Sequence, residues 1–280
     1  MLAFAANSLL CREALGHRLI DAASFSTVRV MAGAATLGLI LLLRRRTLDR
    51  GTAGWRSAAM LFTYMAFFSF AYLSLSAGTG ALILFGAVQL TMFGIALRRG
   101  ERFPAGARIG FAIAVIGLVY LVSPGVTAPD PLGALLMAVA GIAWGLYSLS
   151  GRGAKDALSA TATNFAFAVP LVIAVSVIFA GGFHASPHGF VLAAASGAIA
   201  SGCGYTIWYA ALPHLTATRA AIVQLSVPVI AALGGVLLLG EQPTWRLALA
   251  SAATLGGVAM VLAQRAAQGA AQGTAKTSEK

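Results

Sequence analysis

The chain has 280 residues, of which 59% are hydrophobic and only 10% charged, and its mean hydropathy is +0.86. Soluble domains carry about 25% charged residues because their surfaces face water, so this composition excludes a soluble globular protein. The net charge of +11 does not indicate nucleic-acid binding, because the basic residues are scattered over short connectors and form no single basic face. Lipid is therefore the expected solvent for most of the surface.

Long apolar stretches, separated by charged residues, glycine pairs and prolines, predict ten membrane-spanning helices, since a span needs about 20 apolar residues. The first is the weakest, because only eleven residues precede Arg12 and Glu13. The polar residues after the last helix predict a disordered tail. In chain order, the expected helices are 1–16, 20–43, 56–76, 79–98, 105–123, 131–150, 158–180, 188–211, 216–239 and 245–264.

Lysine and arginine residues gather in alternate connectors, which predicts the orientation of the chain. If the N-terminus lies in the cytoplasm, 15 of them fall in cytoplasmic connectors or in the tail, and three, Arg12, Arg18 and Arg246, in external connectors. The remaining arginine, Arg29, lies inside the second expected helix. We therefore expect both termini in the cytoplasm.

The chain contains an internal repeat: residues 64–117 align without gaps on residues 204–257 at a constant offset of 140 residues. A repeat of five helices is odd, so the second copy must enter the membrane from the opposite side. This predicts an all-α integral membrane protein with two inverted five-helix repeats, at residues 1–123 and 131–264, followed by the tail at 265–280. Inverted repeats are typical of secondary transporters. The informative pairs are Arg12/Arg152 and Gly100-Glu101/Gly240-Glu241, because matches of small residues arise by chance in a chain rich in alanine and glycine.

Several local motifs carry a resemblance to a known family. In these motifs the chain resembles the drug/metabolite transporter superfamily, specifically its ten-helix members with two EamA domains. The resemblance implies a secondary transporter, with export as the favoured direction, for small metabolites such as amino acids or drugs in a bacterial inner membrane. Phe4 departs from the pattern, because the second repeat has Trp144 there. The motifs are Arg29, Ser76-Ala77-Gly78-Thr79-Gly80-Ala81, Gly100-Glu101, Gly141-Ile142-Ala143-Trp144-Gly145, Ala211-Leu212-Pro213, Ala217-Thr218, the run Val227-Pro228-Val229-Ile230-Ala231-Ala232-Leu233 and Gly240-Glu241.

Polar and aromatic side chains deep in the expected spans are candidate substrate contacts, because such groups are costly in lipid. Aromatic rings with polar tips suit a cavity for an organic solute, although packing or an interfacial belt explains them too. Arg29 either attracts an anionic group or has a structural role, and we favour the structural role. Gln89 either contacts substrate or joins helices. The candidate substrate-binding residues are Arg29, Tyr64, Gln89, Trp144, Tyr147, Tyr205 and Tyr209.

All eight acidic residues lie at helix ends, in connectors or in the tail. Coupling through a carboxylate inside the membrane is therefore not expected, and facilitated diffusion, exchange or coupling through the substrate's own charge fits better. Glu101 and Glu241 are expected to cap helices that open with Pro104 and Pro243. The histidines and cysteines have no ligand spacing, so no cofactor or metal is expected.

A carrier that works by alternating access is the leading functional hypothesis. A passive channel is the first alternative, and a structural membrane subunit is another. An intramembrane enzyme would need clustered acids, a metal site or phosphate-binding basic residues, and the sequence offers none of these, so an enzyme is not expected. The expected partners are a small-molecule substrate and the lipid bilayer, without nucleic acid, and a homodimer stays open.

Overall fold

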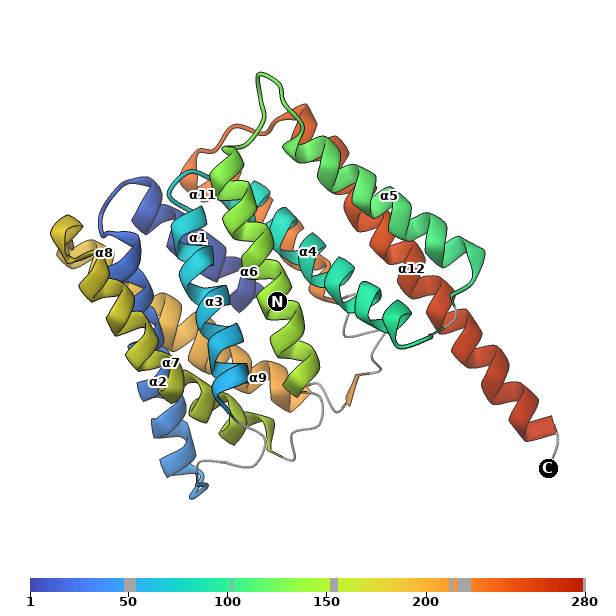
Figure 1. Ribbon diagram of the computed structural model, residues 1–280, viewed down its shortest axis with the longest axis horizontal. Coiled ribbons are helices and arrows are strands. Elements are labelled where there is room, and N and C mark those ends of the chain that lie inside the picture. Colours follow the sequence, from blue (N-terminus) through green and yellow to red (C-terminus); the bar gives the residue numbers. More distant parts are fainter. Residues whose placement is uncertain (48–53, 102, 152–155, 212–213, 216–222, 279–280) are drawn as a thin grey trace.

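The computed structural model describes residues 1–47, 54–101, 103–151, 156–211, 214–215 and 223–278. Within these ranges the chain is helical and has no β-strand beyond one isolated bridge, which confirms the all-α prediction (Figure 1). In chain order the helices are α1 (Leu2–Gly16), α2 (Ala22–Leu43), α3 (Trp55–Ala71), α4 (Ala77–Arg98), α5 (Ala105–Val122), α6 (Pro131–Ser150), α7 (Ala157–Ile178), the short 3-10 helix η2 (Ala180–Gly182), α8 (Pro187–Ala195), the π-helix η3 (Ser196–Cys203), α9 (Gly204–Ala211), α11 (Ser226–Leu239) and α12 (Trp245–Ser278).

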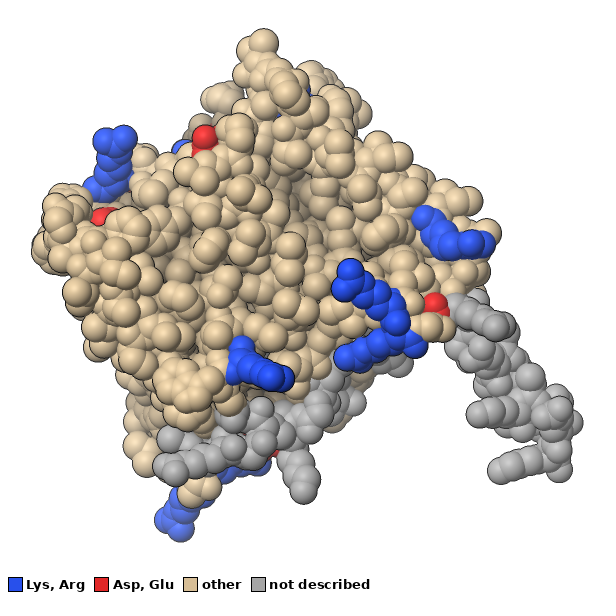
Figure 2. Space-filling view, in the orientation of Figure 1, with Lys and Arg blue, Asp and Glu red and all other residues tan. Residues whose placement is uncertain are grey.

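The outside of the bundle is suited to lipid. Within the described residues, seven helices are long and apolar enough to cross a membrane, one of them the continuous segment Pro187–Trp208. Helices α1, α3 and α11 are shorter, so the count of ten spans stays a prediction. Most of the face in Figure 2 carries no charged side chain. Large apolar side chains are exposed on the surface of the bundle, among them Leu42, Leu43, Val177 and Leu237.

Two helix boundaries differ from the prediction for identifiable reasons. Helix α4 begins at Ala77, before the expected start at residue 79, because the Ser76 side chain accepts a hydrogen bond from the backbone N–H of Thr79. Helix α12 continues to Ser278 and extends beyond the bundle in Figure 1, so the predicted disordered tail at 265–280 differs from the structure. The tail is rich in alanine, which has the highest helix propensity.

Helices from the two halves of the chain pack on one another in pairs. Helix α2 packs on α7, α4 on α11, and α5 on α12. Helix α6 packs on both α3 and α4, and α1 packs on η3 and α11. Helices α5 and α12 lie side by side along one edge of the bundle in Figure 1. The helices α1, α3, α4, α6 and η3 consequently surround the centre of the molecule.

Asp156 fixes the start of α7. Its carboxylate accepts hydrogen bonds from the backbone N–H groups of Leu158 and Ser159 at 3.1 and 3.2 Å, and from Arg46 Nη1 at 2.9 Å. Burial opposes the charged form, but the bonds from Ser159 and Arg46 outweigh it and lower the pKa of Asp156. The carboxylate therefore joins the end of α2 to the start of α7 in its ionised form.

Replacing Asp156 by alanine should lower the free energy of unfolding by about 1 kcal/mol at neutral pH, because the cap and the ion pair are lost. Since the pKa is lower in the folded state, this contribution is present above the ordinary carboxyl pKa of about 4 and disappears as the pH falls through the folded value. Thermal unfolding in detergent at neutral and acidic pH measures the difference. An equal penalty at both pH values would rule out the ionised cap.

Candidate substrate site

A small cavity lies where α1, α3, α4, α6 and the η3–α9 segment meet. Its volume is about 20 Å³, which is room for about one water molecule. Its wall is mainly aromatic, with a few polar groups, which is the usual composition of a binding site for an organic solute. The cavity is narrow in this structure because its own side chains fill most of the space. Its lining consists of Phe4, Asn7, Ser8, Tyr64, Phe68, Leu84, Phe85, Trp144, Ala200, Ser201, Tyr205 and Gln224.

Trp144 of α6 lies at the centre of an aromatic cluster. Its ring stacks on Tyr205 with centroids 5.3 Å apart and planes at 26°. The Tyr64 ring lies 4.8 Å away on one side, and the Tyr147 ring, one helical turn further along α6, lies 5.5 Å away. Three segments distant in sequence thus contribute rings to one cluster, and aromatic pairs of this geometry attract one another beyond the area that they bury.

Arg29 of α2 contacts this cluster from behind. The residue is fully buried, and its Nη2 donates a hydrogen bond to the Tyr64 hydroxyl at 3.1 Å. The guanidinium carbon lies 5.3 Å from the centroid of the Tyr64 ring and 4.8 Å from that of Phe68, both in the range of cation–π attraction. Within the described part of the chain, Nε and Nη1 of Arg29 have no hydrogen-bond partner.

The π-helix η3 carries part of the cavity wall. Its run of small residues lets it approach α2 and α1 closely: a side chain at Gly197 would overlap the carbonyl oxygen of Arg29, and Ser196 Oγ donates to Asn7 Oδ1 at 2.6 Å. The wider π turns precede Tyr205, and such turns are frequent at functional sites. The helix period assumed for 188–211 did not predict this segment, although the sequence Ser-Gly-Ala-Ile-Ala-Ser-Gly-Cys signals close packing.

The predicted site residues divide into three groups. Tyr64, Trp144 and Tyr205 line the cavity. Arg29 and Tyr147 lie one layer behind it, where each contacts a ring of the lining. Gln89 is buried in α4 but is not part of the lining, and the Tyr209 side chain lies outside the described residues.

Helix α1, the weakest of the predicted helices, contributes Phe4, Asn7 and Ser8 to the lining. The candidate list does not include these residues, because an apolar ring and two small polar groups near the start of a chain are ordinary features. The repeat offers a signal for one of them, since Phe4 corresponds to Trp144 at the offset of 140 residues. Both members of that pair line the same cavity.

Glu241 joins three elements about one helical turn beyond the cavity. Its carboxylate accepts the backbone N–H of Ala77 at 2.9 and 3.0 Å and pairs with Arg12 Nε at 3.2 Å. Arg12 Nη1 also donates to the carbonyl of Tyr72 at 3.4 Å. Arg12 and Tyr72 each follow a lining residue, Ser8 and Phe68, by four positions. We call these contacts the Glu241 network.

The expected capping role of Glu241 applies to a different helix. The sequence predicts that Glu241 caps the helix that follows it, but its carboxylate lies at the N-terminus of α4. Helix α12 begins at Trp245, and Thr244 Oγ1 accepts from the N–H of Leu247 at 3.1 Å. Pro243 therefore lies outside the helix, and Thr244 provides the local cap.

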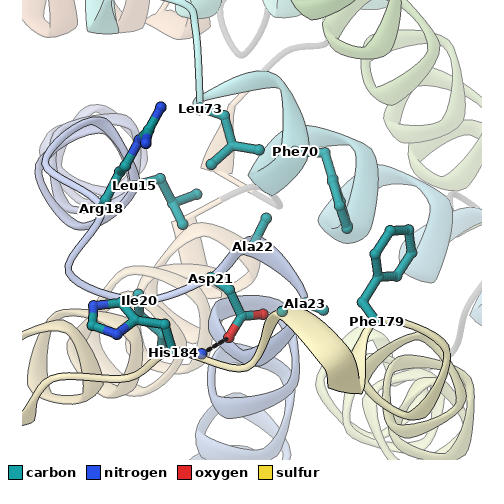
Figure 3. A pocket seen from close by; sticks show the side chains of 11 residues that line it. Leu15, Arg18, Ile20, Asp21, Ala22, Ala23, Phe70, Leu73, Phe179 and His184 are labelled. Atoms are coloured by element: carbon teal, nitrogen blue, oxygen red, sulfur yellow. Dashed lines mark hydrogen bonds between the residues drawn. The ribbon is translucent and has the colours of Figure 1, made fainter.

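A larger groove lies at the surface near the end of α1 (Figure 3). It has a volume of about 520 Å³ and is lined largely by apolar side chains of α1, α3 and α7 and their connectors, such as Leu15, Phe70, Leu73 and Phe179. Asp21 at its edge accepts the N–H of His184 at 3.1 Å. None of the cluster of Tyr64, Trp144 and Tyr205 lines this groove, so the central cavity is the better candidate site.

Comparisons with known proteins agree with this architecture. The profile of the EamA-like transporter family matches residues 131–263. An uncharacterised protein of Pseudomonas aeruginosa is 52% identical over 273 residues, which cover 98% of this chain and 95% of that protein. The chain belongs to the EamA-like transporter family.

Two further comparisons match this EamA-family protein at lower sequence identity. An uncharacterised transporter of Archaeoglobus fulgidus is 29% identical over 220 residues, 72% of this chain and 73% of that protein. One solved crystal structure matches with a TM-score of 0.65 at 20% identity, over 93% of this chain and 96% of the other, and this likeness shows the fold alone. The resemblance read from the motifs is confirmed: the chain is a multi-pass membrane protein of a transporter family, not an enzyme family.

Proposed function

We propose that the protein is a secondary transporter that exports a small organic solute, such as an amino acid or a drug, across the bacterial inner membrane by alternating access. Both termini lie in the cytoplasm, and the two halves of the chain form inverted repeats. The central cavity binds the solute, with Tyr64, Trp144 and Tyr205 as its contacts. The observation that carries the proposal is that two offset pairs, Phe4 with Trp144 and Leu84 with Gln224, line one cavity.

The pairing of helices supports the inverted repeat. At an offset of 140 residues, α2 corresponds to α7, α4 to α11 and α5 to α12, and each of these helices packs on its counterpart. This is expected for two copies related by a two-fold axis that passes between them. A site near such an axis is exposed alternately to either side when one repeat rocks against the other.

The small volume of the cavity favours a carrier over a passive channel. A volume of about 20 Å³ cannot hold an organic solute, so the solute must enter through a conformational change. The Glu241 network joins α1, α3 and α4 one helical turn beyond the lining residues Ser8 and Phe68, and we propose that it keeps this end of the cavity, the external end in the predicted orientation, closed. A passive channel in its open state would instead have a continuous path across the membrane.

Replacing Trp144 by alanine should lower transport at least tenfold, because the central ring of the cluster is lost while the fold around the cavity remains. A screen of deletion and overexpression strains for resistance to toxic metabolites identifies a solute, and uptake into proteoliposomes measures its flux. Trp55 is a matched control, since it is exposed at the start of α3 and stacks on Phe167. Equal fluxes for the Trp144 and Trp55 variants would argue against the cavity as the site.

A further inference from the structure

On the basis of the proposed function, we infer that the transported solute carries a negatively charged group, that the Tyr64 hydroxyl binds this group, and that Arg29 behind Tyr64 supplies the positive charge. The nearest chemical class is a small organic carboxylate with an apolar body.

The charge of Arg29 has no counter-ion in the described structure. The residue is 0% exposed, and no acidic residue of the described ranges forms an ion pair with it. Two of its three nitrogens lack a hydrogen-bond partner there. A buried cation without a counter-ion is costly, and the rings of Tyr64 and Phe68 offset only part of that cost.

A purely structural arginine would look different. Such a residue donates to carbonyl groups at helix C-termini or extends its head group to the membrane surface. Arg29 does neither in the described structure: the hydrogen bond that it makes there goes to the Tyr64 hydroxyl, and its side chain stays within the bundle. The structure therefore favours the functional alternative over the structural role preferred from the sequence.

The Tyr64 hydroxyl connects this charge to the cavity. It accepts a hydrogen bond from Arg29 Nη2, and its own hydrogen has no acceptor within the described part of the chain. A phenol that accepts a bond from a cation becomes a stronger donor, because bonds in such a chain polarise one another. Tyr64 also lines the cavity, and the inference assigns this donor to an anion bound there.

The rest of the cavity indicates the body of the solute. Trp144, Tyr205 and Phe4 present rings on the wall, and the polar groups beside them are neutral. One fixed positive charge behind an aromatic wall selects a single negative charge on an apolar or flat body. A dianion would leave one charge without compensation, and a cation would be repelled by Arg29.

The test compares acids with their neutral amides on the purified full-length protein. The probes are phenylacetate and hexanoate, their amides, and phenethylamine as the cationic counterpart. Thermal unfolding in detergent measures binding without requiring transport. We expect both acids to raise the Tm, and the amides and the amine to leave it unchanged. The inference is wrong if the amides or the amine stabilise as well as the acids, or if neither acid stabilises.

Tyr64→Phe separates binding from folding, because the ring and its contact with Arg29 remain while the hydroxyl is lost. A hydrogen bond to a charged group is worth a tenfold change in affinity or more, so the acids should bind at least tenfold more weakly. Tyr120→Phe, on the outer side of α5, serves as the control and should leave binding unchanged. Arg29→Lys should retain the preference for acids. Unchanged acid binding in Tyr64→Phe would overturn the assignment.

Transport data distinguish this inference from the proposed function. If proteoliposomes transport a neutral or cationic solute but no carboxylate, the anion site is wrong and the carrier stands. If no solute of any charge in the resistance screen is transported, the proposed function itself fails.

Discussion

Replacing Glu241 by glutamine should shift the transporter toward the state in which the central cavity is open to the exterior. The glutamine loses the charge that pairs with Arg12 and one of the two oxygens that accept the N–H of Ala77. Hydrogen bonds to charged groups contribute about 1.5–3 kcal/mol each. Since 1.4 kcal/mol is a factor of about ten in an equilibrium constant, we expect the outward-open population to rise about tenfold or more.

Accessibility of a cysteine at Ser8 measures this shift. Ser8 is buried on the cavity wall, one turn from Arg12, and the two native cysteines are replaced by alanine in the background. A membrane-impermeant thiol reagent added outside the cell should label Ser8→Cys about tenfold faster in the Glu241→Gln variant. Glu13→Gln is the control, because Glu13 pairs with His17 at the surface.

Two results would contradict this account of the Glu241 network. One is an unchanged labelling rate in Glu241→Gln, which would mean that the network does not hold the cavity closed. The other is faster labelling only from the cytoplasmic side, which would mean that the predicted orientation is inverted.

Replacing Gly257 by alanine should destabilise the pair of helices α5 and α12. A Cβ atom at this position would overlap the carbonyl oxygen of Gly110 and lie 2.6 Å from the backbone nitrogen of Ala114. Backbone atoms cannot move aside as a flexible side chain can, so the helices must separate. Overpacking of this kind costs about 1–3 kcal/mol.

The neighbouring Gly256 provides a matched control in the same helix. A Cβ atom there meets no other atom within 4 Å. Gly256→Ala should leave the stability unchanged or raise it by up to about 1 kcal/mol, because alanine favours the helix interior. Thermal unfolding of both variants in detergent gives the comparison. A Gly257 variant as stable as the Gly256 variant would show that the close approach of α5 and α12 contributes little.

Hydropathy and charge predict most of the helices, because each span must satisfy its own backbone in lipid and ends where polar residues begin. The boundaries that differ depend on local chemistry. Ser76 starts α4 earlier than the glycines around it suggest, and Thr244 rather than Glu241 caps α12. The contact between Arg12 and Glu241 joins residues 229 positions apart, and no local pattern contains it.

The candidate site could be predicted only in part. Tyr64 stands out because a polar aromatic ring is unusual at mid-span, and Trp144 and Tyr205 because rings with polar tips suit a cavity for an organic solute. All three line the cavity. Gln89 has a similar depth but is not part of the lining, since depth gives no information about the face of a helix. Ser201 lines the cavity but is not among the candidate residues. It lies in the π-helix η3, where the π period changes which residues share a face.

Counterflow in proteoliposomes tests the central claim, alternating access to one central cavity, most directly. Liposomes that contain the purified protein are loaded with unlabelled solute, and labelled solute is then added outside at low concentration. A carrier should accumulate the label transiently above its outside concentration, and Trp144→Ala should abolish this accumulation. Label that only equilibrates, at a rate independent of the solute inside, would indicate a passive channel and contradict the account.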